Sequence, residues 1–283
     1  MFKRKNDASE IQLNIKKDRV WEVDALRGLL ALCVVLHHLY LTVDQFCIKG
    51  IYTNLDPDWY INFSDPLHFW FDYDENGNII KVFAKGFLDN WSLLGRYTFF
   101  WVSGISTAFT RDNFNRGVKM LLAAYATTAY SLIMVWLTGN DGLFIRFGLI
   151  HCYAYTMLLY CLLAKLKPKI ILLLGNIIVI VGVVLSNLDI YSNYPWLYMF
   201  GINEYNVATQ QYYPLFPFMG FFLIGVFVGS KLYKEKKTIF PNFNHGFLKP
   251  LEIMGKYSGL IYMSHLVIYP LVFYLIGVIF NLF

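Results

Sequence analysis

Seven apolar stretches constrain this chain more than any other feature of its sequence. A helical membrane crossing takes about 20 predominantly apolar residues, and each stretch is close to that length. They fall at about 20–43, 91–110, 117–138, 144–164, 168–188, 213–233 and 257–280. We therefore expect an all-α, polytopic integral membrane protein with about seven transmembrane helices.

The composition argues against a soluble globular domain. Of the 283 residues, 57% are hydrophobic, 19% are aromatic and only 15% are charged. A soluble core could not bury so much apolar surface. The four cysteines form neither a disulfide framework nor a metal-binding pattern, so we expect no metal cofactor.

The distribution of basic residues predicts an orientation. With the N-terminus inside, alternating connections leave only five of the 24 basic residues outside, namely Lys49, Lys81, Lys85, Arg96 and Arg146. Because Lys and Arg collect in cytoplasmic loops, we expect a cytoplasmic tail over 1–19 and an external C-terminus. The net charge of +5 then reflects topology, so the expected partner is a lipid bilayer and not nucleic acid. The expected location is a bacterial inner membrane.

The longest connection, residues 44–90, is expected outside with a β-hairpin of its own. Two aromatic or β-branched runs flank Asn76-Gly77, a dipeptide typical of tight primed turns. The same stretch imitates the start of a calcium loop, but Phe83 stands where a bidentate glutamate would be needed. The hairpin is the favoured interpretation. Together with the polar loop 189–212, this connection is expected to form an entrance for an acceptor.

The first apolar stretch carries ionisable residues that a lipid-facing helix would not tolerate. Such groups are costly in a bilayer unless they face a protein interior or a watery cavity. At 100° per residue, Arg27 and His38 share one helix face and lie about 16 Å apart along the axis, while His37 points elsewhere. Asp24 precedes Arg27 by three residues and can pair with its guanidinium. The stripe of Asp24, Arg27 and His38 is therefore the first place to look for chemistry.

This stretch also carries a family resemblance. The string RVWEVDALRGLLALCVVLHH is similar to the first transmembrane helix of the membrane-embedded acyltransferases, and most resembles the heparan-alpha-glucosaminide N-acetyltransferase catalytic family. Later segments fit the same family: FFWVSGIS at 99–106, FIRFGLIH at 144–151, and YYPLFPFMGFFLIG and GKYSGLIYMSHLVIYP towards the C-terminus. The resemblance implies one membrane-embedded acyltransferase domain over 1–283. It also implies transfer of an acyl group, expected to be acetyl, from cytoplasmic acetyl-CoA to a sugar or glycan.

The resemblance makes His38 the expected catalytic base. A neutral imidazole can take a proton from an attacking amine or hydroxyl; the alternative is a histidine hydrogen-bonded inside the bundle. The lysosomal enzyme of this family differs, with asparagine at the place of His38 and a histidine shortly after this helix, so its acceptor does not carry over. His151 is expected at a depth comparable to His38, either as a second catalytic histidine or as a satisfied core histidine.

Four further residues are expected on the donor side. Arg27, with Asp24, can bind phosphate bidentately, although an interface-anchoring arginine is the alternative. An extended acyl-pantetheine arm is similar in length to the separation of Arg27 and His38. His265 is expected near the depth of Arg27, where it would contact the donor. Ser103 belongs to a Ser-Gly pair that resembles that of the acyltransferases, with close helix packing as its alternative role.

The alternative function is that of a membrane transporter whose intramembrane Arg and His line a substrate or proton path. Seven unequal helices show no evident inverted repeat, which weakens this interpretation. The sequence leaves open the acceptor's identity, the oligomeric state, and whether an acetyl-histidine forms during transfer.

Overall fold

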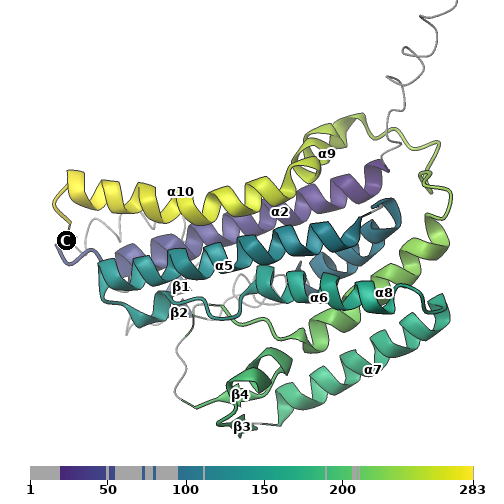
Figure 1. The fold of residues 1–283 in the computed structure, drawn as a ribbon. Coiled ribbons are helices and arrows are strands. Elements are labelled where there is room, and N and C mark those ends of the chain that lie inside the picture. The colour runs from purple at the N-terminus through teal and green to yellow at the C-terminus, as the bar shows by residue number, and fades with distance from the viewer. Residues whose placement is uncertain are drawn as a thin grey trace, which may run out of the picture.

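The computed structural model describes residues 20–48, 51–54, 72–73, 79–80, 95–110, 112–188, 190–205, 209 and 211–282. Within these ranges the chain is mainly helical (Figure 1). The longer helices are α2 (Trp21–Val43), α5 (Asn113–Thr138), α6 (Leu149–Leu163), α7 (Pro168–Asn187), α8 (Leu215–Leu232) and α10 (Ser258–Ile279). The shorter helical elements are η1 (Asp44–Ile48), the segment 95–105, η3 (Ser106–Phe109), η4 (Asp141–Leu143), η5 (Pro195–Phe200), η6 (Gly246–Leu248) and α9 (Lys249–Lys256). The expectation of a mainly helical fold is confirmed for the described part of the chain.

Four of the described helices, α5, α7, α8 and α10, are long and apolar enough to cross a membrane. The helix α6 is apolar but shorter. Only 17% of the most apolar window of α7 is buried within the protein, against 56% of that of α8. The helix α8 is therefore an inner helix, whereas α7 presents an apolar surface outward, as a lipid-facing helix does. These helices support a membrane protein, while the count of seven crossings and the orientation stay predictions.

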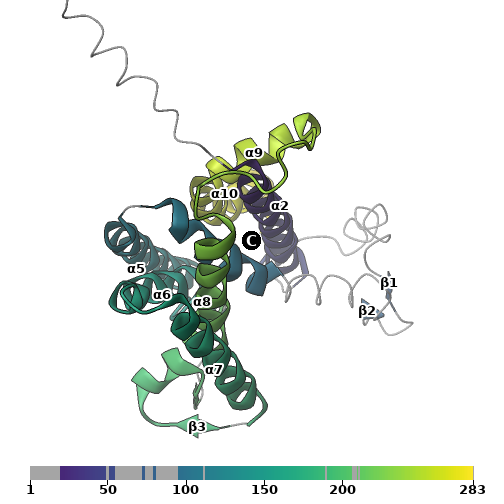
Figure 2. The same cartoon turned by 90° about the vertical axis from the view of Figure 1, so that its right-hand side faces the viewer.

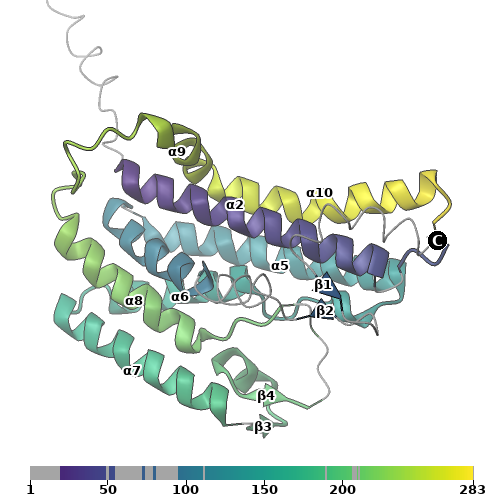
Figure 3. The ribbon, with the colours of Figure 1, turned by 180° about the vertical axis from the view of Figure 1, so that it is seen from behind.

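The helices α2, α9 and α10 form one side of the bundle (Figures 1 and 3). The helix α9 packs against the first turns of α2, and α10 continues along the rest of it. Gly28 and Gly255 make this contact possible. A Cβ on Gly28 would collide with the carbonyl oxygen of Leu251, and one on Gly255 would collide with that of Asp24. The backbones of α2 and α9 are thus in direct contact, which side chains at these two positions would prevent.

The helix α8 lies near the middle of the bundle when the protein is viewed along its length (Figure 2). It packs against α7 and α6. It also meets the segment 95–105 backbone to backbone, since a Cβ on Gly104 would collide with the Phe222 carbonyl and one on Gly225 with the Trp101 carbonyl. The largest fully buried side chains around α8 include Phe100, Met157, Leu215, Phe222 and Leu223. The main core of the described protein is therefore centred on α8.

In the described part of the chain, two pairs of short strands stand outside the helical bundle. The strands β1 (Asp72–Tyr73) and β2 (Ile79–Ile80) pair antiparallel on either side of residues 74–78, which lie outside the described residues. They stand where the sequence predicts a hairpin. The strands β3 (Tyr191–Ser192) and β4 (Asn203–Glu204) pair in parallel beyond the end of α7.

Candidate active site

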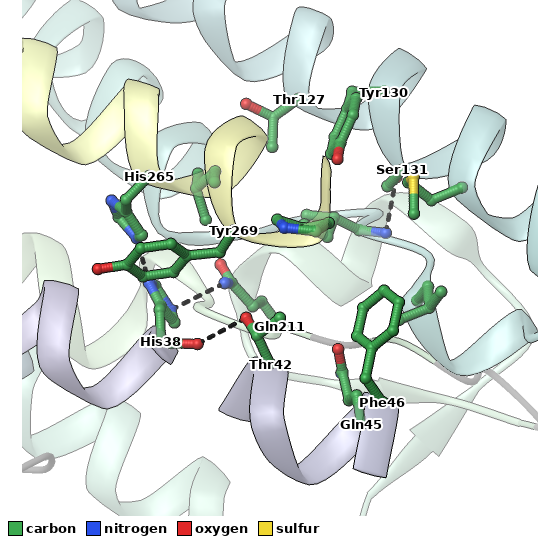
Figure 4. A pocket seen from close by; sticks show the side chains of 15 residues that line it. His38, Thr42, Gln45, Phe46, Thr127, Tyr130, Ser131, Gln211, His265 and Tyr269 are labelled. Atoms are coloured by element: carbon green, nitrogen blue, oxygen red, sulfur yellow. Dashed lines mark hydrogen bonds between the residues drawn. The ribbon is translucent and has the colours of Figure 1, made fainter. Parts of the chain in front are cut away.

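His38 of α2 and His265 of α10 meet side chain to side chain (Figure 4). The Nδ1 atom of His38 lies 2.5 Å from Nε2 of His265, and the two ring planes are 20° from parallel. The contact follows from the parallel course of the two segments. His38 lies ten residues beyond Gly28, and His265 lies ten residues beyond Gly255. Because these glycines are in backbone contact, equal steps along each segment bring the two histidines to the same level.

The partners of this pair assign the protons on both imidazole rings. His265 Nδ1 lies 3.0 Å from the carbonyl oxygen of Ile261. A carbonyl only accepts, so Nδ1 of a neutral His265 carries the proton and its Nε2 accepts. His38 must then donate from Nδ1, which leaves its Nε2 as an acceptor. The Nε2 atom of Gln211, 3.3 Å away, is placed to donate to it.

A pocket opens beside His38 (Figure 4). It is lined by α2 and η1, α5, α10 and the segments that precede α6 and α8. Its polar side chains come from His38, Thr42, Gln45, Thr127, Tyr130, Ser131, Gln211, His265 and Tyr269. Such a mixture of hydroxyl, amide and imidazole groups suits hydrogen bonding to a polar ligand.

Gln211 reaches His38 because two loop segments lie side by side. Phe147 and Tyr212 form an isolated parallel bridge, and Tyr213 N donates to Phe147 O over 3.1 Å. The Thr209 hydroxyl lies 3.0 Å from the Phe144 carbonyl oxygen. Residues before α8 are thereby fixed against residues before α6, and Gln211 is held at the pocket. Gln211 belongs to the loop expected to receive the acceptor, but its contact with His38 depends on this pairing and was not predicted.

The expected depth of His265 is wrong. Counting from the start of the apolar stretch 257–280 placed His265 level with Arg27, on the donor side. In the structure, α9 occupies the level of Arg27 along α2, through the contact of Gly255 with Gly28. The helix α10 begins beyond that level, so His265 contacts His38 instead. The repeated spacing of a glycine and a histidine ten residues later is the sequence signal that could have revealed this pair.

His151 lies in a different hydrogen-bond network and does not line the pocket. Its Nδ1 accepts from Gly148 N over 3.3 Å, so its Nε2 carries the proton and donates to Thr128 Oγ1 at 3.1 Å. The Thr128 hydroxyl in turn donates to the carbonyl oxygen of Ile145. This arrangement caps the N-terminus of α6 and gives both ring nitrogens of His151, which is 3% exposed, a hydrogen-bond partner. Of the alternatives for His151, the geometry favours the satisfied core histidine.

Arg27 and Asp24 form the ion pair that their spacing predicts. Arg27 Nη1 lies 3.4 Å from Asp24 Oδ1, and the arginine side chain is 24% exposed. Both residues lie in α2, which is one continuous helix from Trp21 to Val43. Arg27 therefore stands about three turns from His38 on the same helix. Ser103 is buried at 6% exposure beside Gly104, where the segment 95–105 packs on α8.

Arg146 ties the loop after α7 to the segment that carries Ile145 and Phe147. Its Nη1 lies 2.6 Å from Glu204 Oε2, and its guanidinium stands 5.4 Å from the centroid of the Tyr198 ring. Burial raises the pKa of Tyr198 to about 12, although Arg146 opposes the shift. The phenol is therefore neutral at physiological pH. Arg146 supports the loop that leads to Gln211, and Arg96 stands 5.6 Å from the Tyr213 ring on the same approach.

Comparison with known proteins identifies a family. The family described as "Heparan-alpha-glucosaminide N-acetyltransferase, catalytic" matches residues 66–267. No curated protein and no solved structure matches the chain. The matched span includes Gln211 and His265, and it begins after α2, so the contact between His265 and His38 connects α2 to the matched region. The match covers more than half of the chain, which therefore belongs to the heparan-alpha-glucosaminide N-acetyltransferase catalytic family, an assignment that points to a membrane acetyltransferase.

Proposed function

We propose that this protein transfers an acetyl group from acetyl-CoA to a hydroxyl or amino group of a sugar or glycan, with His38 as the general base. The observation that carries the proposal is the hydrogen bonding of the two ring nitrogens of His38. Its Nδ1 is engaged by His265, and its Nε2 is an acceptor at the edge of a polar pocket. A basic nitrogen held in this way is what acyl transfer to a poor nucleophile requires.

The proposed reaction needs one proton to move twice. His38 Nε2 removes the proton from the acceptor oxygen or nitrogen as that atom forms a bond to the thioester carbonyl carbon. The carbon–sulfur bond breaks, and the sulfur leaves with the bonding electrons. His38 then returns the proton to the sulfur, so that the products are the acetylated acceptor and free CoA thiol. The donor supplies the activated thioester, and the residues of the chain supply the base and its orientation.

Arg27 is the proposed site for the donor phosphates. Its guanidinium is part-exposed and lies on the same continuous helix as His38. A guanidinium matches phosphate geometry bidentately, and Asp24 beside it would orient the fork. The separation of about 16 Å along α2 is similar to the length of an extended acyl-pantetheine arm. Donor phosphates at Arg27 would therefore allow the thioester to reach His38.

The pocket beside His38 is the proposed acceptor site. Thr127 and Tyr130 contribute hydroxyl groups from α5, and Gln45 contributes an amide, whereas the Ser131 hydroxyl already donates to Thr128 O and accepts from Ile145 N. Pro270, inside α10, has no N–H to pair with the carbonyl of Leu266, and both residues line the pocket. Without a donor at Pro270, that carbonyl can accept a hydrogen bond from a sugar hydroxyl. A ligand rich in hydroxyl groups fits this lining well.

A transfer assay tests the proposal against the transporter alternative. The purified protein, reconstituted in lipid, is incubated with acetyl-CoA labelled in the acetyl group and with a panel of amino sugars, neutral sugars and oligosaccharides. The proposal predicts acceptor-dependent release of free CoA and appearance of the label in the acceptor. Uptake of a sugar into proteoliposomes, with no CoA released for any acceptor, would contradict it and favour a transporter.

A further inference from the structure

The bond between His38 and His265 has a direction, and the backbone of α10 sets it. The carbonyl of Ile261 lies one helical turn before His265 and accepts from its Nδ1 at 3.0 Å. This carbonyl cannot donate, so a neutral His265 presents an unprotonated Nε2 to His38. At 2.5 Å, His38 Nδ1 can meet that atom only as a donor. The direction of both hydrogen bonds is therefore set by a backbone oxygen that can only accept.

From this direction we infer that His265 is a positioning residue, which holds His38 in the tautomer that carries its proton on Nδ1 and keeps Nε2 basic. The inference rests on the proposed role of His38 as the base. It makes His265 a partner of the base His38 and not a ligand of the donor phosphates. In other acyl-transfer sites, a hydrogen-bond partner likewise fixes the tautomer of the catalytic histidine.

Gln211 cannot perform this task alone. Its amide group contacts the other nitrogen of His38 at 3.3 Å, but an amide offers a donor on one side and an acceptor on the other. A rotated Gln211 could accept from a protonated Nε2 and would stabilise the wrong tautomer equally well. His265 has no such freedom while Ile261 O holds its Nδ1 proton. His265 is also 4% exposed, so water does not readily replace this contact.

The same contact also supports His38 after it takes a proton. The imidazolium then donates its Nδ1 proton to His265 Nε2, and this stronger charge-assisted bond stabilises the cation. Removal of His265 should therefore slow the chemical step and leave donor binding almost intact. Outer partners that orient metal-binding histidines typically contribute roughly 10- to 100-fold, and we use the same scale for His265. We expect a loss of that size in kcat, with little change in the KM for acetyl-CoA.

Two substitutions separate positioning from packing. In His265→Gln, the side-chain oxygen can still accept from His38 Nδ1, whereas His265→Leu fills similar space with no acceptor. The tautomer of His38 is measured by nitrogen-15 NMR of the full-length protein labelled at histidine, with His38→Gln to assign its signals. We predict a proton on Nδ1 in the wild type, a mixture of both tautomers in His265→Gln because a glutamine amide can accept or donate, and a shift towards Nε2 in His265→Leu. Transfer activity should be highest in the wild type, intermediate in His265→Gln and lowest in His265→Leu.

The possible results are distinguishable. An unchanged His38 tautomer and unchanged kcat in a folded His265→Leu protein would overturn the inference. Equal losses in both variants, with the His38 tautomer unaltered, would also overturn it and indicate a packing role. If the tautomer shifts as predicted but His38→Gln retains full transfer activity, the positioning contact stands and the proposed catalytic role of His38 fails.

Discussion

Gly28 in α2 and Gly255 in α9 leave no room for side chains between their backbones, and this contact brings His38 level with His265. Gly255→Ala would place a methyl group against the Asp24 carbonyl oxygen. Such overpacking typically costs about 1–3 kcal/mol. We expect a lower thermal stability and a marked loss of acetyl transfer, because α10 would move relative to α2.

Gly259→Ala is the matched control for this change. Gly259 lies in the first turn of α10, and a Cβ there would meet no atom within 4 Å. Alanine favours helix over glycine by up to about 1 kcal/mol, so stability should be unchanged or slightly higher and activity retained. Similar behaviour of the two variants would show that the glycine contact does not set the position of the histidines.

The donor site makes a second prediction. Arg27→Ala should weaken acetyl-CoA binding because a bidentate phosphate contact is lost, and Arg27→Lys should restore it only in part. Charge-assisted hydrogen bonds contribute about 1.5–3 kcal/mol, so Kd should rise roughly 10- to 150-fold in the alanine variant. Calorimetry or a fluorescent CoA analogue measures this. Unaltered donor affinity in a folded Arg27→Ala protein would mean that the arginine serves only its ion pair with Asp24.

His151 should behave differently from His38. Its two hydrogen bonds join the N-terminus of α6 to Thr128 of α5. His151→Ala leaves buried polar groups without partners, at a cost of about 1–3 kcal/mol each. We therefore expect a lower melting temperature, with kcat per folded molecule changed by less than about tenfold. A stable His151→Ala protein with no activity would indicate that His151 is a catalytic residue.

The helices could be predicted from the sequence because apolar length and local periodicity determine them. The expected stretches 20–43, 168–188 and 257–280 agree with α2, α7 and α10 to within one residue at each end. The pairing of Arg27 with Asp24 was equally local, since i and i+3 positions on a helix are neighbours. Residues that interact within one helix are therefore within reach of sequence analysis.

The contact between His38 and His265 could not be predicted in the same way. It joins residues 227 positions apart, and it depends on the level at which α10 begins. Counting from the start of an apolar stretch assumed that α2 and α10 start at equal depth, whereas α9 takes up the first turns of α2. Gln211 was missed for a related reason, because the pairing of its loop with residues before α6 has no hydropathy signal.

Topology provides a prediction independent of the chemistry. A reporter fused after Phe283 should be exposed on the outer face, because the basic loops predict an odd number of crossings from an internal N-terminus. Paired reporters that are active on only one side of the membrane, such as alkaline phosphatase and a green fluorescent protein, measure this. An internal C-terminus would rule out the arrangement of seven helices.

Substitution of His38 has an internal control in the neighbouring histidine. His37 is the adjacent residue, turned by about 100° on the helix, and it does not line the pocket beside His38. His37→Ala should therefore retain most of the activity. Equal losses from His37→Ala and His38→Ala would indicate damage to the packing of α2 and not the removal of a base.

The most direct measurement is the rate of acetyl transfer by His38→Ala as a function of pH, with acetyl-CoA binding measured on the same preparation. A general base must be neutral to act, so wild-type turnover should rise with pH through the pKa of His38 and then level off. His38→Ala should lose most of this dependence and roughly 10²–10⁴-fold in rate, with donor binding nearly intact. A larger loss is expected if an acetyl-histidine forms, because the covalent route would then be absent. Full activity in a folded His38→Ala protein would exclude His38 as the general base.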